Sequence, residues 1–298
     1  LIPLGDLNAD ESKRVITMLG QAGRDEVRAL ADRYVDPAET DKAFRRLAGF
    51  WEENLSVFQC STPDPAFDSM VNVHNPRQCH TTLNWSRYLS LYQLGIGTRG
   101  IGFRDSSQDA MGALAGAPGE ALALIRKLLG IQLPDGSAMH QFYPSTMAAD
   151  HGDAQEEAEK GKLIYGDDHL WIVLAVTAYL KETGDFDFLH EEITFYDAHR
   201  PIAGREKDSV HGHLRRALAY TKANVGTHGL PLLGYADWND TVNLDGKAES
   251  IFNACLYGLA LREMAALCAH LCEPEQSQSY LDDHKEMARR FNEAAWDG

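Results

Sequence analysis

Apolar residues along most of this 298-residue chain recur three or four positions apart, the spacing of one face of an α-helix. The first such face consists of Phe44, Leu47, Trp51 and Leu55, with charged residues on the opposite side. The same periodicity predicts helices near 66–76, 80–94, 105–116, 118–132, 167–183, 209–225, 248–272 and 275–295. Strand-like alternation is found mainly in residues 1–20. The pattern therefore predicts a mainly α-helical protein with a short β segment at its N-terminus.

Two long loops interrupt this succession of helices, at 132–166 and 226–247. Helices that follow one another in this way form a bundle, a solenoid or a ring of helix pairs. Loops of this length inside a compact helical protein are usually functional, and a ring of helix pairs gathers its loops at one end of the core. We therefore expect the chemistry of this chain in these two loops.

The net charge of −16 argues against nucleic acid or an anionic membrane surface as the main partner. The apolar stretch Trp171–Leu180 is too short to span a bilayer, and no leader pattern opens the chain. The five cysteines are odd in number and lack metal-type spacing, which predicts a reduced, cytoplasmic protein without a metal site.

The segment Asp237–Asp240 places two carboxylates and an indole within four residues, just after a loop rich in Gly and Pro. The indole of Trp238 offers a flat apolar face to a sugar ring, and a carboxyl group can protonate a glycosidic oxygen. An Asx-rich turn with a Trp folded into the core explains the same four residues. The segment alone does not decide between these interpretations.

A second group of charged residues lies earlier in the chain, within 23 positions: Arg87, Arg99, Arg104, Asp105 and Asp109. Four nearby glycines allow the backbone to approach a ligand, and the planar fork of Arg suits phosphate or carboxylate. The alternative is a glycine-rich helix corner in which Asp105 is the N-cap and the arginines form salt bridges.

Two further loop segments carry polar groups beside aromatic rings, 135–144 and 165–171. In the second, Asp168 and His169 could bind sugar hydroxyls. Structurally, Asp167 is explained as an N-cap, Asp168 by the helix dipole and Trp171 as a core residue.

Five segments, in this order and at these separations, resemble glycoside hydrolase family 94, the cellobiose, cellodextrin, cellobionic acid and chitobiose phosphorylases. They are Trp85–Tyr88, Arg99–Asp109, Asp135–Gln141, Asp167–Trp171 and Ala236–Asp240. The resemblance implies an (α/α)6 catalytic barrel, of which residues 58–298 would form the first two-thirds or so. Residues 1–20 would end an N-terminal β-sandwich, and 25–57 would form a helical linker. An incomplete ring would leave apolar side chains of its last helices open, with Leu256, Leu259, Met264 and Leu267 as candidates.

The resemblance also implies roles for individual residues. Asp240 matches the general acid, and Arg87 matches a phosphate ligand. Trp238, Arg99 and Asp105 match residues that hold the transferred sugar. Arg104, Gln141, Asp168 and His169 lie in shared motifs and are expected to bind substrate. The remaining phosphate ligands of the family, a His and a Thr-Gly pair, would lie beyond residue 298.

The expected activity is inverting phosphorolysis of a β-linked glucose disaccharide, cellobionic acid or cellobiose, to α-glucose 1-phosphate. Inorganic phosphate would be the co-substrate, without a cofactor or metal, and the full-length protein would be a homodimer. The alternatives are a chitobiose or cellodextrin phosphorylase, an inverting hydrolase on the same barrel, or a non-catalytic fragment that binds sugar or phosphate. A general acid must be protonated, so we expect the pKa of Asp240 to be raised by burial beside Trp238 or by Asp237.

Overall fold

The computed structural model describes residues 5–20, 22–86, 100–144, 146–161, 164–244 and 247–296. It divides into two compact units, 1–57 and 58–298. The assignment of the parts to a sandwich, a linker and a barrel stays a prediction. Arg87 and Arg99 lie outside the described residues.

The first unit contains α1 (Val27–Tyr34) and α2 (Pro37–Ser56). Asp36 begins α2 because its carboxylate accepts a hydrogen bond from the backbone N–H of Ala38, and Pro37 occupies the first turn. Residues 5–20 contain a turn and no assigned strand, so the alternation in this segment did not predict its conformation.

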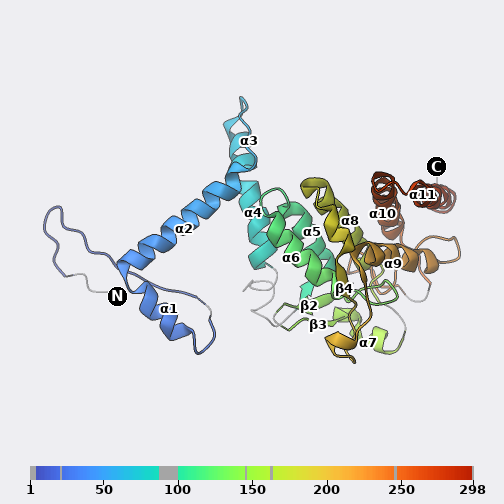
Figure 1. Cartoon of the computed structure of the whole chain (residues 1–298), viewed down its shortest axis with the longest axis horizontal. Helices are drawn as coiled ribbons and strands as arrows, with labels where there is room; N and C mark the ends of the chain where they lie inside the picture. Colours follow the sequence, from blue (N-terminus) through green and yellow to red (C-terminus); the bar gives the residue numbers. More distant parts are fainter. Residues whose placement is uncertain are drawn as a thin grey trace. The chain divides into compact units, whose positions relative to one another are not determined.

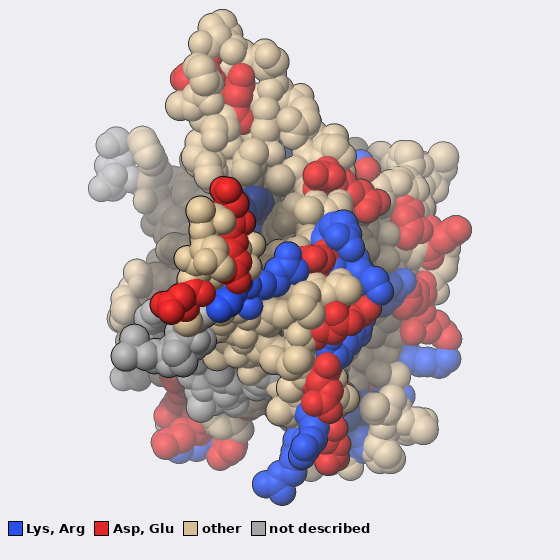
Figure 2. Space-filling model, turned by 90° about the vertical axis from the view of Figure 1, so that its left-hand side faces the viewer, with Lys and Arg blue, Asp and Glu red and all other residues tan. Residues whose placement is uncertain are grey.

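Charges of opposite sign lie next to one another in this unit. Arg14 pairs with Asp41, and Glu39 pairs with both Arg33 and Lys42. On the face drawn in Figure 2, described basic side chains likewise lie beside acidic ones.

The second unit is mainly helical, which confirms the predicted class (Figure 1). Its helices are α3 (Pro65–Ser69), α4 (Asn75–Thr81), α5 (Phe103–Ala113), α6 (Pro118–Leu129), α7 (Gln155–Glu159), α8 (Asp168–Thr183), α9 (Val210–Ala223), α10 (Ile251–His270) and α11 (Pro274–Ala294). Two π-helical turns, Met70–His74 and Thr82–Ser86, flank α4. Closure of the helices into a six-pair ring stays a prediction.

Two small antiparallel sheets lie among the helices. The first joins β1 (Ile101–Gly102), β2 (Gln141–Tyr143) and β3 (Ala148–Asp150), with Ile101 opposite Phe142. The second pairs β4 (Glu192–Thr194) with β5 (Lys207–Ser209). The first sheet connects the start of α5 to the loop that precedes α8.

Helix α8 is the centre of the core. It is apolar on nearly every face and packs against α5, α6, α9 and α10, between which Figure 1 shows it. Helix α10 is also mostly apolar, and by length and composition alone it could cross a membrane. The apolar window of this helix is 56% buried inside the protein, as in the core helix of a soluble protein. The sequence interpretation had considered only Trp171–Leu180.

The apolar face predicted to be open is largely covered. Leu256, Met264 and Leu267 are buried, because α8, α9 and α11 all pack against α10, whereas Leu259 is 48% exposed. The prediction was therefore wrong for three of the four residues. It treated α10 as an edge helix, but its neighbours α8, α9 and α11 surround most of it.

The two long loops meet, as their predicted role required. The backbone N–H of Gly166 donates to the carbonyl of Ala236 at 3.0 Å, and that of Tyr235 donates to the carbonyl of Ile164 at 2.7 Å. Gly234 makes this approach possible: its φ is +70°, and a Cβ there would lie 2.1 Å from the Ile164 carbonyl oxygen. The loops therefore bring the starts of α8 and α10 to one end of the unit.

Candidate active site

A buried arginine joins three segments at this end of the helices. Arg104 is the second residue of α5, and its guanidinium donates to the Asp237 carbonyl and to Oδ1 of Asp240, both at 2.9 Å. Its Nε lies 3.5 Å from Oδ2 of Asp167, at the start of α8. Its Cζ lies 5.5 Å from the centre of the Tyr165 ring. We call Arg104, His140, Tyr165, Asp167, Asp168 and Asp240 the Arg104 cluster.

A backbone hydrogen bond of the preceding residue fixes the position of Arg104. The N–H of Phe103 donates to the carbonyl of His140 at 2.7 Å, at the end of the β1–β2 ladder. Burial disfavours the charged guanidinium, but the carboxylates of Asp167, Asp168 and Asp240 outweigh burial and raise the pKa of Arg104. A permanent, rigid positive charge therefore faces the Asp240 carboxylate.

Asp167 occupies the predicted N-cap position of α8, but its side chain makes no capping hydrogen bond. Its Oδ2 instead accepts from the indole N–H of Trp171 at 3.0 Å and faces Arg104. Burial and the adjacent Asp168 raise the pKa of Asp167, and Arg104 opposes them. Asp167 and Asp168 each have one buried oxygen, Oδ1, that forms no hydrogen bond. These oxygens are available to a ligand or a water molecule.

His140 is a member of the cluster to which the sequence assigned no role. Its Nδ1 lies 2.9 Å from Oδ2 of Asp168, and its ring stacks on Tyr165 with centroids 3.7 Å apart. Burial lowers the pKa of His140, but the Asp168 carboxylate outweighs burial, so that the net shift is upward. The signal in the sequence was its place next to Gln141 in a shared motif.

The loop that carries Asp240 is fixed by Asp237. Its carboxylate accepts from the backbone N–H of Asn239 at 2.9 Å and from the hydroxyl of Ser250 at 2.5 Å. Ser250 in turn caps α10 through the N–H of Asn253. Asp237 thus has the Asx-turn role considered from the sequence, and it positions Asp240 three residues later.

Asp240 is not buried, contrary to the sequence expectation. Its side chain is 64% exposed, and its carboxylate pairs with Arg104 instead of lying in an apolar environment beside Trp238. Burial beside Trp238 was wrong as the expected cause of a raised pKa, because Trp238 itself is 55% exposed; a raised pKa of Asp240 stays a prediction. Asp240 therefore projects towards solvent from a rigid base.

Trp238 ends a row of aromatic side chains. Its ring centroid lies 6.3 Å from that of Phe252, which lies 6.3 Å from that of Trp171. Phe252 and Trp171 support the Trp238 ring from the α8–α10 side and leave much of it accessible. An exposed, supported indole beside an exposed carboxylate is the arrangement expected for binding a sugar ring next to an acid.

The other predicted substrate residues are less directly placed. The Gln141 amide donates to Oδ1 of Asp150 at 2.7 Å, which ties β2 to β3. Asp105 is half-buried in the first turn of α5, one residue after Arg104. His169 faces away from the cluster: its fully buried ring lies 2.6 Å from the Thr221 hydroxyl and against Tyr220. A direct sugar contact by His169 is therefore not supported by this geometry.

Among the described residues, one group has side chains close enough to hold a metal ion, and it contains none of the Arg104 cluster. The cluster itself combines one guanidinium with carboxylates, an imidazole and a phenol. It can hold a polar ligand by hydrogen bonds and position one exposed carboxyl group.

The catalytic-domain model of the glycosyl hydrolase 94 superfamily matches residues 50–298. The chain belongs to this family. It is 30% identical to an N,N'-diacetylchitobiose phosphorylase of Vibrio furnissii, over 98% of the chain and 37% of that protein. It is 32% identical to a solabiose phosphorylase of Paenibacillus borealis, over 95% and 33%. It is 22% identical to a cellobionic acid phosphorylase of Neurospora crassa, over 92% and 32%. The chain thus spans about a third of the length of these relatives.

Proposed function

We propose that the protein is an inverting disaccharide phosphorylase in which Asp240 is the general acid. The observation that carries this proposal is the placement of a single exposed carboxyl group, Asp240, beside an exposed indole, Trp238, on a loop anchored by buried Arg104. The relatives named as phosphorylases support it.

In the proposed reaction, the Asp240 carboxyl group donates its proton to the glycosidic oxygen. A phosphate oxygen attacks the anomeric carbon from the opposite face and forms the new C–O bond as the glycosidic C–O bond breaks. The products are an α-sugar 1-phosphate and the released acceptor sugar. Phosphate is an anion near neutral pH, so no second carboxylate is needed as a base. Arg87 stays the proposed phosphate ligand.

Arg104 and the exposure of Asp240 fit this cycle. After proton transfer the Asp240 carboxylate is negative, and the guanidinium 2.9 Å away stabilises that charge. Because the side chain is 64% exposed before substrate binds, water can return the proton. The bound disaccharide would then cover the carboxyl group and exclude water during the reaction.

The relatives indicate which disaccharides to place first. Two N,N'-diacetylchitobiose phosphorylases are 30% and 31% identical over 98% of the chain, and a solabiose phosphorylase is 32% identical over 95%, against 22% for the cellobionic acid phosphorylase. We therefore place N,N'-diacetylchitobiose and solabiose ahead of the cellobionic acid or cellobiose that the sequence motifs suggested. We propose a cytoplasmic location because all five cysteines are free thiols, and a homodimer as the functional form.

The test is release of sugar 1-phosphate from N,N'-diacetylchitobiose, solabiose, cellobiose and cellobionic acid, with and without inorganic phosphate, by the protein at its natural length. Phosphate-dependent release with the α configuration at the new bond is expected. Free sugar formed at the same rate without phosphate would identify an inverting hydrolase instead. Ligand binding by calorimetry without turnover would show a non-catalytic binding protein.

A further inference from the structure

A second group of reactive side chains lies away from the Arg104 cluster. His211 is in the first turn of α9, Cys268 is in the last turn of α10, and Glu273 is the N-cap of α11. One imidazole nitrogen, the thiol sulfur and one carboxylate oxygen all lie within 4.8 Å of one another. The three residues come from three different elements, so their meeting is a consequence of the fold.

The turn between α10 and α11 places two of the three. Cys272 adopts a left-handed conformation with a φ of +61°, and the backbone N–H of Glu273 donates back to the carbonyl of Cys268 at 2.8 Å. This is the hydrogen bond of a Schellman motif, in which the chain reverses at the helix end. Cys272 takes the position usually held by glycine, and the reversal brings Glu273 beside Cys268.

The third side chain comes from α9. The hydroxyl of Ser209 accepts from the N–H of Gly212 and fixes the first turn, where His211 lies. The Nε2 atom of His211 is buried and forms no hydrogen bond. Burial lowers the pKa of His211, which favours the neutral imidazole, the form that binds metals. A buried imidazole nitrogen without a partner needs an explanation in a packed interface.

We propose that His211 Nε2, Cys268 Sγ and the Glu273 carboxylate bind a Zn²⁺ ion that joins α9 to the α10–α11 turn. Nitrogen, thiolate and carboxylate ligands together are characteristic of zinc, whereas Mg²⁺ and Ca²⁺ select oxygen ligands. In a tetrahedral site with bonds of about 2.0–2.3 Å, ligand atoms lie about 3.3–3.8 Å apart. Side-chain rotations that bring the three ligand atoms about 1 Å closer to one another would allow all three to bind the ion. A water molecule supplies the fourth ligand.

The charges around the group are compatible with this ion. The Glu273 carboxylate and the Arg215 guanidinium act on the Cys268 thiol from nearby. Zinc displaces the thiol proton, which leaves to solvent as the metal–sulfur bond forms. The divalent ion compensates the negative charges of the thiolate and the carboxylate, which Arg215 offsets only in part.

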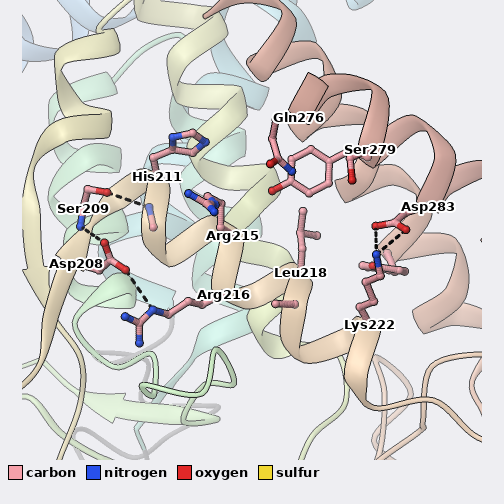
Figure 3. Close-up of a pocket in the computed structure, with 14 residues that line it drawn as sticks. Asp208, Ser209, His211, Arg215, Arg216, Leu218, Lys222, Gln276, Ser279 and Asp283 are labelled. Atoms are coloured by element: carbon pink, nitrogen blue, oxygen red, sulfur yellow. Dashed lines mark hydrogen bonds and ion pairs between the residues drawn. The ribbon is translucent and has the colours of Figure 1, made fainter. Parts of the chain in front are cut away.

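An approach path exists beside the group. His211 and Arg215 line a cavity of about 480 Å³ between α9 and α11, together with Gln276, Ser279 and Asp283 (Figure 3). In Figure 3, Arg216 and Lys222 are each engaged by aspartates, Asp208 and Asp283, on the walls of this cavity. The cavity is wide enough to admit a hydrated ion to the His211 side of the group.

The proposed site lies away from the Arg104 cluster. Thr221, which holds His169 next to Asp168 of the Arg104 cluster, lies ten residues beyond His211 on α9. At about 1.5 Å per residue, the two positions are about 15 Å apart along the helix. The proposed ion thus connects α9 with α10 and α11 at the end of the helices opposite the Arg104 cluster.

The experiment uses Co²⁺ as a spectroscopic substitute for Zn²⁺ on the metal-free protein at its natural length. A thiolate-to-cobalt charge-transfer band at one equivalent, abolished by added Zn²⁺, is expected. Cys268→Ser should remove the band, and His211→Gln and Glu273→Gln should each weaken binding at least about tenfold. The matched control is Cys272→Ser, an exposed cysteine four residues away, which should leave the band unchanged.

Thermal unfolding supplies a second readout. A hundredfold excess of Zn²⁺ over its dissociation constant should raise the unfolding midpoint of the wild type by about 5 °C. The Glu273→Gln variant changes an exposed residue, so its folding can be confirmed before its metal affinity is compared. No charge-transfer band, or a band that persists in Cys268→Ser and disappears in Cys272→Ser, would overturn the proposal.

Discussion

Replacing Arg104 by methionine would remove the charge on which the candidate active site is built. The Arg104 side chain is 6% exposed, and its partners Asp167 and Asp168 are 0% and 1% exposed. Methionine has a similar length and is apolar, so the variant deletes the charge and its hydrogen bonds without leaving a large cavity. Two buried carboxylates would then lie side by side without the guanidinium, and only Asp168 would keep a basic partner, His140.

The expected cost follows from burial. Removing one partner of a buried ion pair costs about 3–5 kcal/mol, because the remaining charge stays desolvated. The pair with Asp240 adds little to stability, since that carboxylate is 64% exposed. Arg104 acts against the upward pKa shift of Asp167, so its removal raises that pKa further. The loss should therefore be larger at pH 8, where the carboxylate must be ionised, than at pH 5.5.

Urea unfolding followed by circular dichroism measures this loss, with Arg126→Met as the matched control. Arg126 binds Glu191 through three hydrogen bonds of 2.7–3.0 Å, but its side chain is 43% exposed. The control should lose less than about 1 kcal/mol. If Arg104→Met lost no more than Arg126→Met, or if the difference were the same at both pH values, the account of the cluster would be refuted.

Three other predictions concern separate parts of the unit. Gly234→Ala should destabilise the protein by about 2 kcal/mol or more, because its Cβ would lie 2.1 Å from the Ile164 carbonyl oxygen. The control Gly184→Ala has a similar φ but open space around the new Cβ, so it should cost only about 1 kcal/mol. Equal losses of the two variants in urea unfolding would contradict this. Trp238→Ala should raise KM about tenfold, because the sugar loses the indole face. The thermal midpoint should stay unchanged, since the ring is 55% exposed. An unchanged KM would show that Trp238 does not bind the sugar. Burial lowers the pKa of His169 to about 4, below its unfolded value of about 6.5. Its contribution to stability is therefore complete above pH 6.5 and is lost as the pH falls towards 4. The free energy of unfolding should fall by up to about 3 kcal/mol over this range. His169→Gln should flatten this pH dependence of the urea midpoint, and an unchanged slope would show that other groups cause it.

The helices were predictable because apolar periodicity records which face of each segment is buried. The predicted segments 118–132, 167–183 and 209–225 each contain an observed helix, α6, α8 and α9. The two long loops were also correctly expected to meet, since helix pairs gather their connections at one end. The burial of Leu256 was not predictable, because periodicity does not say how many neighbours a helix has.

The site was predictable in its residue types and not in its pairings. The segment Asp237–Asp240 was identified by its composition, but the contact of Asp240 with Arg104 joins residues 136 positions apart. Likewise, His140 reaches Asp168 only because the first sheet sets the position of its loop. The cysteines were correctly found to lack metal-type spacing along the chain. The group around Cys268 is built across three helices, where spacing carries no signal.

The central claim, that Asp240 delivers the proton to the leaving sugar, is tested most directly by comparing two substrates. Phosphorolysis by wild type and Asp240→Asn should be measured on the preferred disaccharide and on an aryl glycoside of the same sugar with an acidic phenol as leaving group. The variant should lose about 10²–10⁴-fold on the disaccharide and retain most of its rate on the aryl glycoside, whose leaving group needs no proton. Equal losses on both substrates, or near-normal turnover of the disaccharide, would contradict the assignment.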